Sequence, residues 1–348
     1  MEFLLDPGIT FLNHGSFGAC PAEVFEEYRR FQLELERQPV GFLGRRFDGL
    51  LGEARAALAA YVGARPDDLV FVPNATAGLN AVIRSLSLEP EDEVLTTAHE
   101  YGGLVKTWEF LGATLVRVEP EELAAAIGPR TRAVFLSHIS SPTALVLPVE
   151  EVCAAARTAG VLAIVDGAHA PGHVPLDLES LGADVYAGNC HKWLCAPKGS
   201  AFLWARPEHH AWIDPLVVSW GWSPEAPFAA KHGWQGTRDP AAFLTVPKAI
   251  EAHGRLDWEG ARALAVRARE WLAAAGYAPV PGVAAPCMFA VELPECDADA
   301  VQRRLWDEHR IEVVVSGWEG GALLRVSIAP YNTEAEVERL LEALRLVL

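Results

Sequence analysis

Short, uninterrupted runs of apolar residues recur between residues 69 and 204, and polar residues, glycine or proline separate them. Runs of this length and composition are typical of strands that are buried on both faces of a parallel sheet. Helical segments alternate with them along the chain. The predicted strands cover residues 69–72, 93–96, 133–136, 161–165, 184–188 and 201–204.

Further helices are predicted before this region and at its start, from apolar residues at helical spacing and from helix-opening sequences. One such helix follows Pro21 and ends near Arg37, a second covers residues 47–62, and a third opens after Pro73. Near the end of the chain, strands are predicted at 288–293, 312–315 and 323–327. A final helix follows them, and it begins with a capping-box sequence, Thr333 to Glu336.

The alternation of strands and helices predicts an α/β fold, with a mostly parallel sheet that is flanked by helices through right-handed crossovers. The later strands and helices predict a smaller α+β domain. We expect a large domain at residues 23–244, and a small domain that combines residues 1–22 with 245–348. A chain of 348 residues with 51% hydrophobic composition is long enough for two such cores.

Two ionisable residues follow neighbouring strands of the predicted sheet. Asp166 ends the run at 161–165, and Lys192 comes shortly after the run at 184–188. Ligands of open α/β sheets bind at the carboxyl ends of the strands. A lysine that forms a Schiff base, opposite an acid that pairs with a pyridine nitrogen, is the arrangement that pyridoxal phosphate (PLP) chemistry requires. A structural ion pair between the two side chains is the alternative.

The use of basic residues sets Lys192 apart from ordinary surface charges. Only five lysines occur among the 29 lysine and arginine residues of the chain. Lys192 stands in a largely uncharged segment that is rich in glycine, cysteine and tryptophan, a setting that is unusual for an exposed lysine.

Charge and cysteine content exclude several classes of function. The formal net charge is −17 and no basic cluster occurs, which argues against a nucleic-acid or membrane partner. The chain has no secretory leader pattern and no apolar stretch of membrane-spanning length, so we expect a cytoplasmic protein. The six cysteines lack paired spacing, which favours free thiols over disulfides or a zinc site. We therefore expect no metal.

The segment from Asp166 to His169, followed by the segment from His191 to Gly199, resembles the class V aminotransferase family of fold-type I PLP enzymes. Within this family the chain is most similar to the isopenicillin N epimerase-like branch, over nearly its whole length. The resemblance implies the aspartate aminotransferase-like fold of PLP-dependent transferases, pyridoxal 5'-phosphate as cofactor, and a homodimer whose active sites are shared between subunits.

The resemblance also assigns residues to the cofactor. The helix start at Ala75 and Thr76 is implied to bind the phosphate, as helix N-termini can, although an ordinary N-cap would explain the same sequence. His99 is implied to stack on the ring. Near the ring hydroxyl the chain offers Ser141 or Thr143. The other implied cofactor residues are His169, Asn189, His191 and Thr237, the last of which reaches the phosphate of the partner subunit.

Three residues are candidates for binding the substrate. Arg325 lies within an apolar run, where a guanidinium needs a partner such as a carboxylate. In the family the arginine before the turn at Tyr331 binds the substrate α-carboxylate. The family's N-terminal segment reaches the substrate, which nominates Asn13 and His14, although both could simply stabilise a turn.

The implied reaction begins with an external aldimine between cofactor and amino acid. Lys192 then removes the α-proton, and Asp166 stabilises the resulting carbanion. Epimerisation or racemisation is the favoured outcome, and its second acid could be Tyr101, His99 or His14. C–S lysis, desulfurase-like elimination and transamination are the alternatives, and a non-enzymatic PLP-binding protein is a further one. Residues 314–321 contain no cysteine, which disfavours a persulfide-forming desulfurase.

Overall fold

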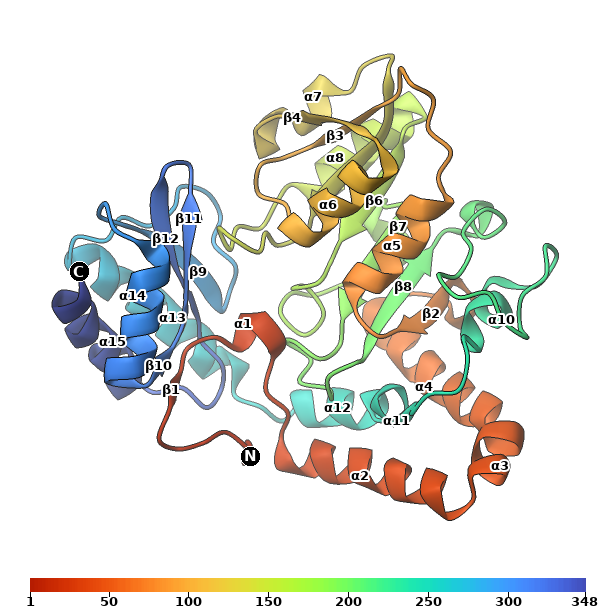
Figure 1. Ribbon diagram of the computed structural model, residues 1–348, viewed down its shortest axis with the longest axis horizontal. Helices are drawn as coiled ribbons and strands as arrows, with labels where there is room; N and C mark the ends of the chain where they lie inside the picture. The colour runs from red at the N-terminus through yellow and green to blue at the C-terminus, as the bar shows by residue number, and fades with distance from the viewer.

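A sheet of seven strands forms the centre of the larger part of the computed structural model, which describes all 348 residues (Figure 1). The strands lie in the order β2-β8-β7-β6-β5-β3-β4. All neighbouring pairs are parallel except those of β8, which runs antiparallel to β2 and β7. The strands are β2 (Leu69–Val72), β3 (Glu93–Thr96), β4 (Thr114–Arg117), β5 (Thr131–Ser137), β6 (Leu162–Asp166), β7 (Val185–Asn189) and β8 (Ala201–Ala205).

The predicted α/β architecture is therefore confirmed, and each of the six strands predicted between residues 69 and 204 is present within one or two residues. The strand β4 was not predicted. It lies at the edge of the sheet, and its four residues are exposed or half-buried. A strand that is only partly covered does not need the continuous apolar run that marks the buried ones.

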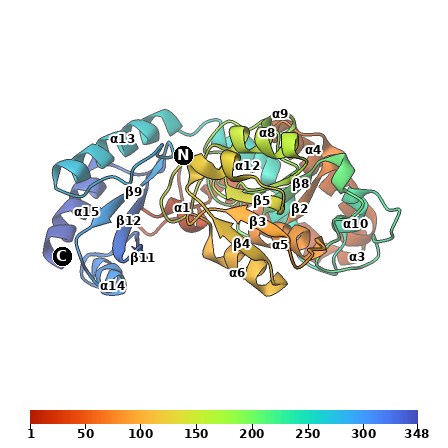
Figure 2. The ribbon, with the colours of Figure 1, turned by 90° about the horizontal axis from the view of Figure 1, so that it is seen from above.

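Helices cover both faces of this sheet (Figure 2). On one face α5 (Ala75–Ser85), α6 (Gly102–Leu111) and α10 (Phe228–Gly233) share one apolar core with the strands. A second core lies on the other face. Its helices are α2 (Ala22–Arg37), α4 (Phe47–Val62), α7 (Leu123–Ala126), α8 (Val149–Ala159), α9 (Leu178–Leu181), α11 (Ala241–Leu244) and α12 (Val246–His253). None of the helices combines the length and the apolar composition that a membrane crossing requires.

The rest of the chain forms a smaller unit with its own core (Figure 1). Its antiparallel sheet has the order β11-β12-β9, formed by Val314–Trp318, Gly321–Ser327 and Met288–Leu293. The helices that pack with it are α13 (Trp258–Ala274), α14 (Ala298–His309) and α15 (Glu334–Val347), and the predicted capping box is present at the start of α15.

The predicted strand at 312–315 is in fact two strands. The first, β10 (Ile311–Glu312), pairs with β1 (Thr10–Phe11) in a separate parallel sheet, and the second, β11, pairs with β12. Val313, which is buried, separates them. The continuous apolar run concealed this break, because both strands and the residue between them contribute to the same core.

The N-terminal segment runs between the two units (Figure 1). It was predicted as an extended piece, but residues His14–Phe17 form a single helical turn, α1. The division between domains at residues 244 and 245 stays a prediction. In the structure α12, which begins directly after it, packs against α2 and α4 of the large unit.

Candidate active site

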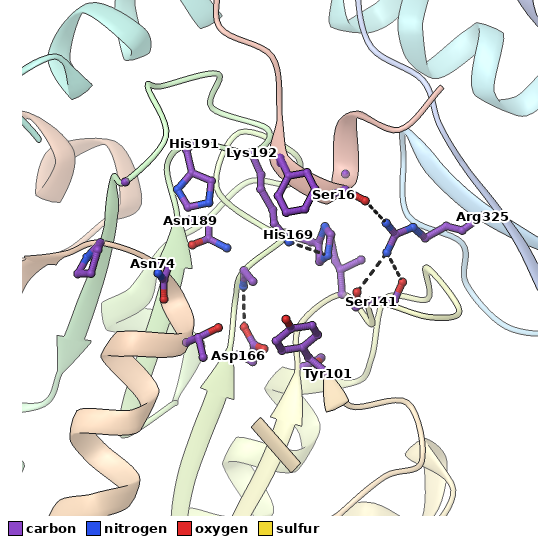
Figure 3. A pocket seen from close by; sticks show the side chains of 18 residues that line it. Ser16, Asn74, Tyr101, Ser141, Asp166, His169, Asn189, His191, Lys192 and Arg325 are labelled. Atoms are coloured by element: carbon purple, nitrogen blue, oxygen red, sulfur yellow. Dashed lines mark hydrogen bonds between the residues drawn. The ribbon is translucent and has the colours of Figure 1, made fainter. Parts of the chain in front are cut away.

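A cavity of about 580 Å³ lies where the carboxyl ends of the central strands face the small unit. Its wall combines the ends of β5, β6 and β7 with the start of α5, the turn α1 and the strand β12 (Figure 3). Asp166, Lys192 and Arg325 all line it. The position agrees with the rule that open α/β sheets bind ligands at the carboxyl ends of their strands.

The amine of Lys192 lies 3.2 Å from Nε2 of His169 (Figure 3). The other ring nitrogen of His169, Nδ1, accepts a hydrogen bond of 3.4 Å from the indole of Trp193. Because an indole N–H can only donate, the neutral His169 ring must carry its proton on Nε2. The ring therefore donates to the lysine amine, which can accept only in its uncharged form.

The surroundings of Lys192 favour that uncharged form. Desolvation in the cavity, together with the positive charge of Arg325, lowers the pKa of Lys192 to about 7, although the charge of Asp166 acts in the opposite direction. Burial also holds the pKa of His169 well below its usual value of 6.5. A lysine with a pKa near neutrality is uncharged in a substantial fraction of the molecules at neutral pH, and this fraction can act as a nucleophile or as a base.

Asp166 is buried at the end of β6, and its Oδ1 accepts a hydrogen bond of 2.9 Å from the amide of Ala168. Burial raises the pKa of the Asp166 carboxyl. No ion pair joins it to Lys192 within 4.0 Å, so the alternative of a structural ion pair is not supported. A buried carboxylate without a cationic partner, at the wall of a cavity, is suited to a ligand that carries a positive charge.

The start of α5 forms one end of the cavity. The carboxamide oxygen of Asn189 accepts a hydrogen bond of 2.8 Å from the amide of Ala75, while Asn74 caps the amide of Ala77. Thr76 and Asn189 both line the cavity. This end therefore offers the Asn189 NH₂ group, the Thr76 hydroxyl and the positive end of a helix dipole, a set that suits an anion such as phosphate.

His191 lies beside this end and also lines the cavity. Its Nδ1 donates a hydrogen bond of 2.8 Å to the carbonyl of Ser200, because a carbonyl can only accept. Burial lowers the pKa of His191 to about 4, which leaves the ring neutral. The phosphate roles of Ala75, Thr76, Asn189 and His191 stay predictions, and the Ala75 amide is already bonded to Asn189.

Arg325 extends from the middle of β12 into the cavity, and it is only 5% exposed. One terminal nitrogen donates to the carbonyl and hydroxyl oxygens of Ser141 at 2.5 and 3.1 Å, and the other donates to the hydroxyl of Ser16 at 3.0 Å (Figure 3). Its Nε has no partner, and no carboxylate lies within 4.0 Å. Burial lowers the pKa of Arg325 to about 10. A buried guanidinium without an anion is an unfilled site for a carboxylate.

The two candidates for the ring hydroxyl have different surroundings. Ser141 lines the cavity, but its oxygens accept hydrogen bonds from Arg325. The hydroxyl of Thr143 is buried and bonded to Ser140 and His99, at 2.6 and 2.8 Å. Thr143 is therefore not available to a ligand in the cavity, and Ser141 stays the candidate of the two.

His99 does not lie where the resemblance suggested. Its Nδ1 is bonded to Thr143, its ring packs at 5.0 Å from that of Trp318, and it does not line the cavity. The aromatic ring on the cavity wall at this strand end is that of Tyr101, near Asp166 (Figure 3). A stacking role would thus suit Tyr101, which the sequence analysis considered only as a possible second acid.

Asn13 and His14 also lie outside the cavity lining, which the next residues of α1, Gly15, Ser16 and Phe17, form instead. His14 is fully buried, and its ring contacts Tyr331 and the backbone of Lys192. Thr237 lines a separate cavity of about 860 Å³ beside α4 and α10. Its role at the phosphate of a partner subunit stays a prediction.

One buried acid near the cavity, Glu100, was not predicted from the sequence. Glu100 accepts hydrogen bonds from the hydroxyls of Thr97 and Ser137, at 2.8 and 2.7 Å, and Ser137 lines the cavity opposite Asp166 in the sheet register. Burial raises the pKa of Glu100 to about 8. The signal available in the sequence was its position directly between His99 and Tyr101, at the end of a predicted strand.

The residues present fit pyridoxal phosphate. The cavity brings together an uncharged lysine, a buried acid without a cationic partner, and a helix N-terminus with free donors. These three features match the aldehyde, the pyridine nitrogen and the phosphate of that cofactor. Arg325, which has no anionic partner, is then available to bind the carboxylate of a second molecule, the substrate.

Comparisons with known proteins agree with this geometry. The sequence profile of the Aminotransferase class-V family matches residues 18–340. The chain is 40% identical to the isopenicillin N epimerase of Amycolatopsis lactamdurans, over 98% of this chain and 96% of the relative. It is 37% identical to that of Streptomyces clavuligerus, over 99% and 96%. A cystine C–S lyase, solved with its product cysteine persulfide, superposes with a TM-score of 0.85 at 23% identity, covering 97% of both chains.

Proposed function

The chain belongs to the class V aminotransferase family and is a pyridoxal phosphate enzyme, and from this premise we propose that it is an epimerase or racemase that inverts the α-carbon of an amino acid. The two isopenicillin N epimerases that it resembles over nearly their full length support this direction. A peptide-like amino acid of the isopenicillin N type is one candidate substrate, and simpler amino acids are others.

The observation that carries the proposal is the unpaired guanidinium of Arg325 in the same cavity as Lys192. A substrate carboxylate that binds to Arg325 would supply the negative partner that this buried positive charge lacks. Such an anchor holds the carbon next to the carboxylate within the cavity that Lys192 also lines. The arrangement suits chemistry at the α-carbon of an amino acid rather than at a distant group.

Bound pyridoxal phosphate withdraws electrons from the α-carbon, which makes its proton acidic. Asp166 would hold the pyridine nitrogen in its protonated form, because a buried carboxylate favours a cationic partner. Thr76, Asn189 and His191 would hold the phosphate. Lys192, with its pKa lowered to about 7, would take the α-proton as general base.

Inversion needs a second acid that reaches the α-carbon from another side. Tyr101 is the candidate, because its ring lies on the cavity wall and its hydroxyl has no hydrogen-bond partner in the protein. Figure 3 shows this hydroxyl directed into the cavity, so that it faces Lys192 and His169 across the cavity. His14 and His99 are less suitable, since neither lines the cavity.

Transfer of sulfur to an enzyme cysteine, the desulfurase alternative that requires a nucleophilic thiol, has no suitable cysteine. The hairpin of β11 and β12, which precedes Arg325, contains none. None of the six cysteines lines the cavity, and burial raises the pKa of each of them. β-Elimination from the substrate needs no enzyme thiol, and it is the second outcome that proton NMR would detect.

The proposal includes a cytoplasmic homodimer with shared active sites. Thr237, on a loop that ends beside α11, would then reach the phosphate of the partner subunit. Its position in a cavity away from Lys192 of its own chain is compatible with this role.

The direct test is proton NMR in D₂O, with the enzyme loaded with pyridoxal phosphate and a panel of amino acids that includes alanine, L-cysteine and L-cystine. Epimerisation predicts loss of the α-proton signal with the amino acid otherwise intact, and chiral analysis then finds the D form. Pyruvate together with sulfide or a persulfide would instead identify a C–S lyase. Exchange without a D product or a keto product would reject both.

A further inference from the structure

The short turn α1 contacts both Lys192, the proposed base, and Arg325, the proposed site for the substrate carboxylate. At its first residue, Nε2 of His14 lies 3.1 Å from the backbone carbonyl of Lys192. Two residues later, the hydroxyl of Ser16 accepts a hydrogen bond of 3.0 Å from the guanidinium of Arg325. One helical turn thus joins the loop that carries the lysine to the strand that carries the arginine (Figure 3).

The hydrogen bonds of His14 determine its protonation. A backbone carbonyl can only accept, so Nε2 carries the proton and donates to Lys192. Nδ1 then accepts from the hydroxyl of Tyr331, at 2.9 Å. Burial lowers the pKa of His14 to about 3 and raises that of Tyr331, so both groups stay neutral. Tyr331 comes from the small unit, so the bond to Lys192 depends on both units.

Ser16 is fixed in a similar way. Its hydroxyl donates to the side-chain oxygen of Asn13, at 2.6 Å, and Asn13 donates to Glu312, at 3.2 Å. The lone pairs of Ser16 are therefore left to accept from Arg325. Asn13, which was expected at the substrate, instead orients the serine that contacts the arginine.

Two glycines allow α1 to approach both units closely. A Cβ atom on Gly15 would lie 2.7 Å from the sulfur of Met288 and 2.8 Å from the hydroxyl of Ser327, both in the small unit. A Cβ atom on Gly18 would lie 2.1 Å from the carbonyl of His191, and its φ of 70° also favours glycine. A larger residue at Gly18 would therefore clash with backbone atoms, whereas at Gly15 it would require the side chains of Met288 and Ser327 to shift.

We propose that α1 fixes the separation between the amine of Lys192 and the guanidinium of Arg325, with His14 and Ser16 as positioning residues. With this separation fixed, we expect the cavity to prefer α-amino acids over amino acids with a longer spacing between the amino and carboxylate groups. This inference rests on the proposed roles of Lys192 and Arg325. It differs from the expectation that His14 contacts the substrate, because His14 lies behind the lysine.

The first test measures Lys192 in the full-length protein without cofactor, so it does not depend on the reaction. The rate of labelling by an amine-reactive reagent is followed against pH, and mass spectrometry identifies the labelled lysine. In the wild type we expect a midpoint of about 7. In His14→Leu the released Lys192 can approach Asp166, and we expect the midpoint to rise by about one unit or more.

Matched variants separate positioning from general damage. Gln at position 14 can place its NH₂ group near the site of Nε2, whereas Asn is too short to reach the carbonyl of Lys192. His14→Gln should therefore keep the wild-type midpoint, and His14→Asn should behave like His14→Leu. If His14→Leu does not fold, Tyr331→Phe tests the same chain of hydrogen bonds by removing the donor to Nδ1. An unchanged midpoint in the folded Leu and Asn variants, or in Tyr331→Phe, would overturn the role of His14.

The second test uses the loaded enzyme and the α-proton exchange reaction. Ser16→Ala should raise the KM for an α-amino acid by about tenfold, because the loss of a hydrogen bond to a charged group leaves Arg325 less well oriented. The kcat should change little, and the KM for a β-amino acid should rise less. A lower KM would show that Ser16 merely competes for Arg325, and would overturn its positioning role. If no amino acid exchanges its proton even in the wild type, the proposed function fails, while the labelling test of His14 still stands.

Discussion

Nε2 of His169 lies 3.2 Å from the amine of Lys192, and the indole of Trp193 determines that this nitrogen is the donor. The arrangement favours an uncharged lysine before any ligand binds. Through His169, the indole of Trp193 therefore adds to the effect of burial in favouring the uncharged amine of Lys192. The pKa of Lys192, about 7, is consistent with this arrangement.

Trp193→Phe should raise the pKa of Lys192, because His169 could then carry its proton on Nδ1 and accept from a charged lysine. We expect a rise of about one unit in the pH midpoint of Lys192 labelling. Trp258→Phe is the matched control, since this indole is buried in the same core but its N–H has no partner. Equal shifts in the two variants would mean that the loss of packing, rather than the hydrogen bond, moves the midpoint.

Lys192→Ala should abolish turnover and the visible absorption band of cofactor that is linked to the lysine. The reason is that no other lysine lines the cavity. Absorption spectra of the purified, loaded protein and the exchange assay check both effects. Lys198→Ala is the control, because Lys198 donates to the carbonyl of Gly18 outside the cavity. A band of wild-type intensity in Lys192→Ala would reject the assignment of the lysine.

Arg325→Ala should raise the KM for amino acids by about 100-fold, as expected for the loss of a charge-assisted contact with a carboxylate. The cofactor should remain bound, because Arg325 does not belong to the phosphate end of the cavity. Kinetics of α-proton exchange and absorption spectra measure the two properties. The exchange of an amine that lacks the carboxylate should be insensitive to the substitution. Simultaneous loss of cofactor would show that Arg325 is structural instead.

Tyr101→Phe should separate proton removal from inversion. The ring remains on the cavity wall, but the hydroxyl that could deliver a proton is lost. We expect formation of the D product to fall by roughly 100-fold or more, the usual range for losing an acid catalyst, while exchange at the original face changes little. NMR in D₂O combined with chiral chromatography measures both rates. An equal fall in both rates would argue that Tyr101 acts on the cofactor rather than as the second acid.

Glu100→Gln should remove part of the pH dependence of stability. Burial raises the pKa of Glu100 from 4.5 to about 8, so the folded state holds a proton that the unfolded state has lost between these values. Glu100 therefore makes the free energy of unfolding fall as pH rises from about 4.5 to about 8. The oxygen of a neutral glutamine can accept from one of the two hydroxyls, and its NH₂ group can donate to the other. The free energy of unfolding of the variant, relative to that of the wild type, should therefore rise by about 3 to 5 kcal/mol between pH 5 and pH 8.

Urea unfolding of the wild type and Glu100→Gln at pH 5 and at pH 8 measures this gain. Asp166 contributes a dependence of the same sign, because burial also raises its pKa, but it is present in both proteins and cancels in the comparison. If the free energies of unfolding of wild type and variant differ by the same amount at both pH values, Glu100 ionises near its ordinary pKa.

The central sheet could be predicted from the sequence because its strands are buried on both faces, and such strands require continuous apolar runs. The same physical signal was absent for the edge strand β4 and misleading at Val313, where one run serves two sheets. Asp166 and Lys192 were predicted at one rim for a related reason, since the ends of neighbouring strands must lie together.

The directions of side chains in the loops could not be predicted in this way. His99 and Tyr101 follow the same strand, and no periodicity outside a helix or strand decides which of them points into the cavity. For His14, the decisive contacts are with Lys192 and Tyr331, which are 178 and 317 residues away along the chain. Only the folded structure brings such distant partners together.

The pairing of β1 with β10 also has a consequence for the synthesis of the protein. Thr10 pairs with Ile311, so the first strand leaves the ribosome long before its partner exists. The seven-stranded sheet, whose last strand ends at Ala205, can form earlier, with the loop of Lys192 already in place. The contacts of His14 with Tyr331 and of Ser16 with Arg325 must wait for β12 and the turn after it, so the sheet can form in the nascent chain before α1 is fixed.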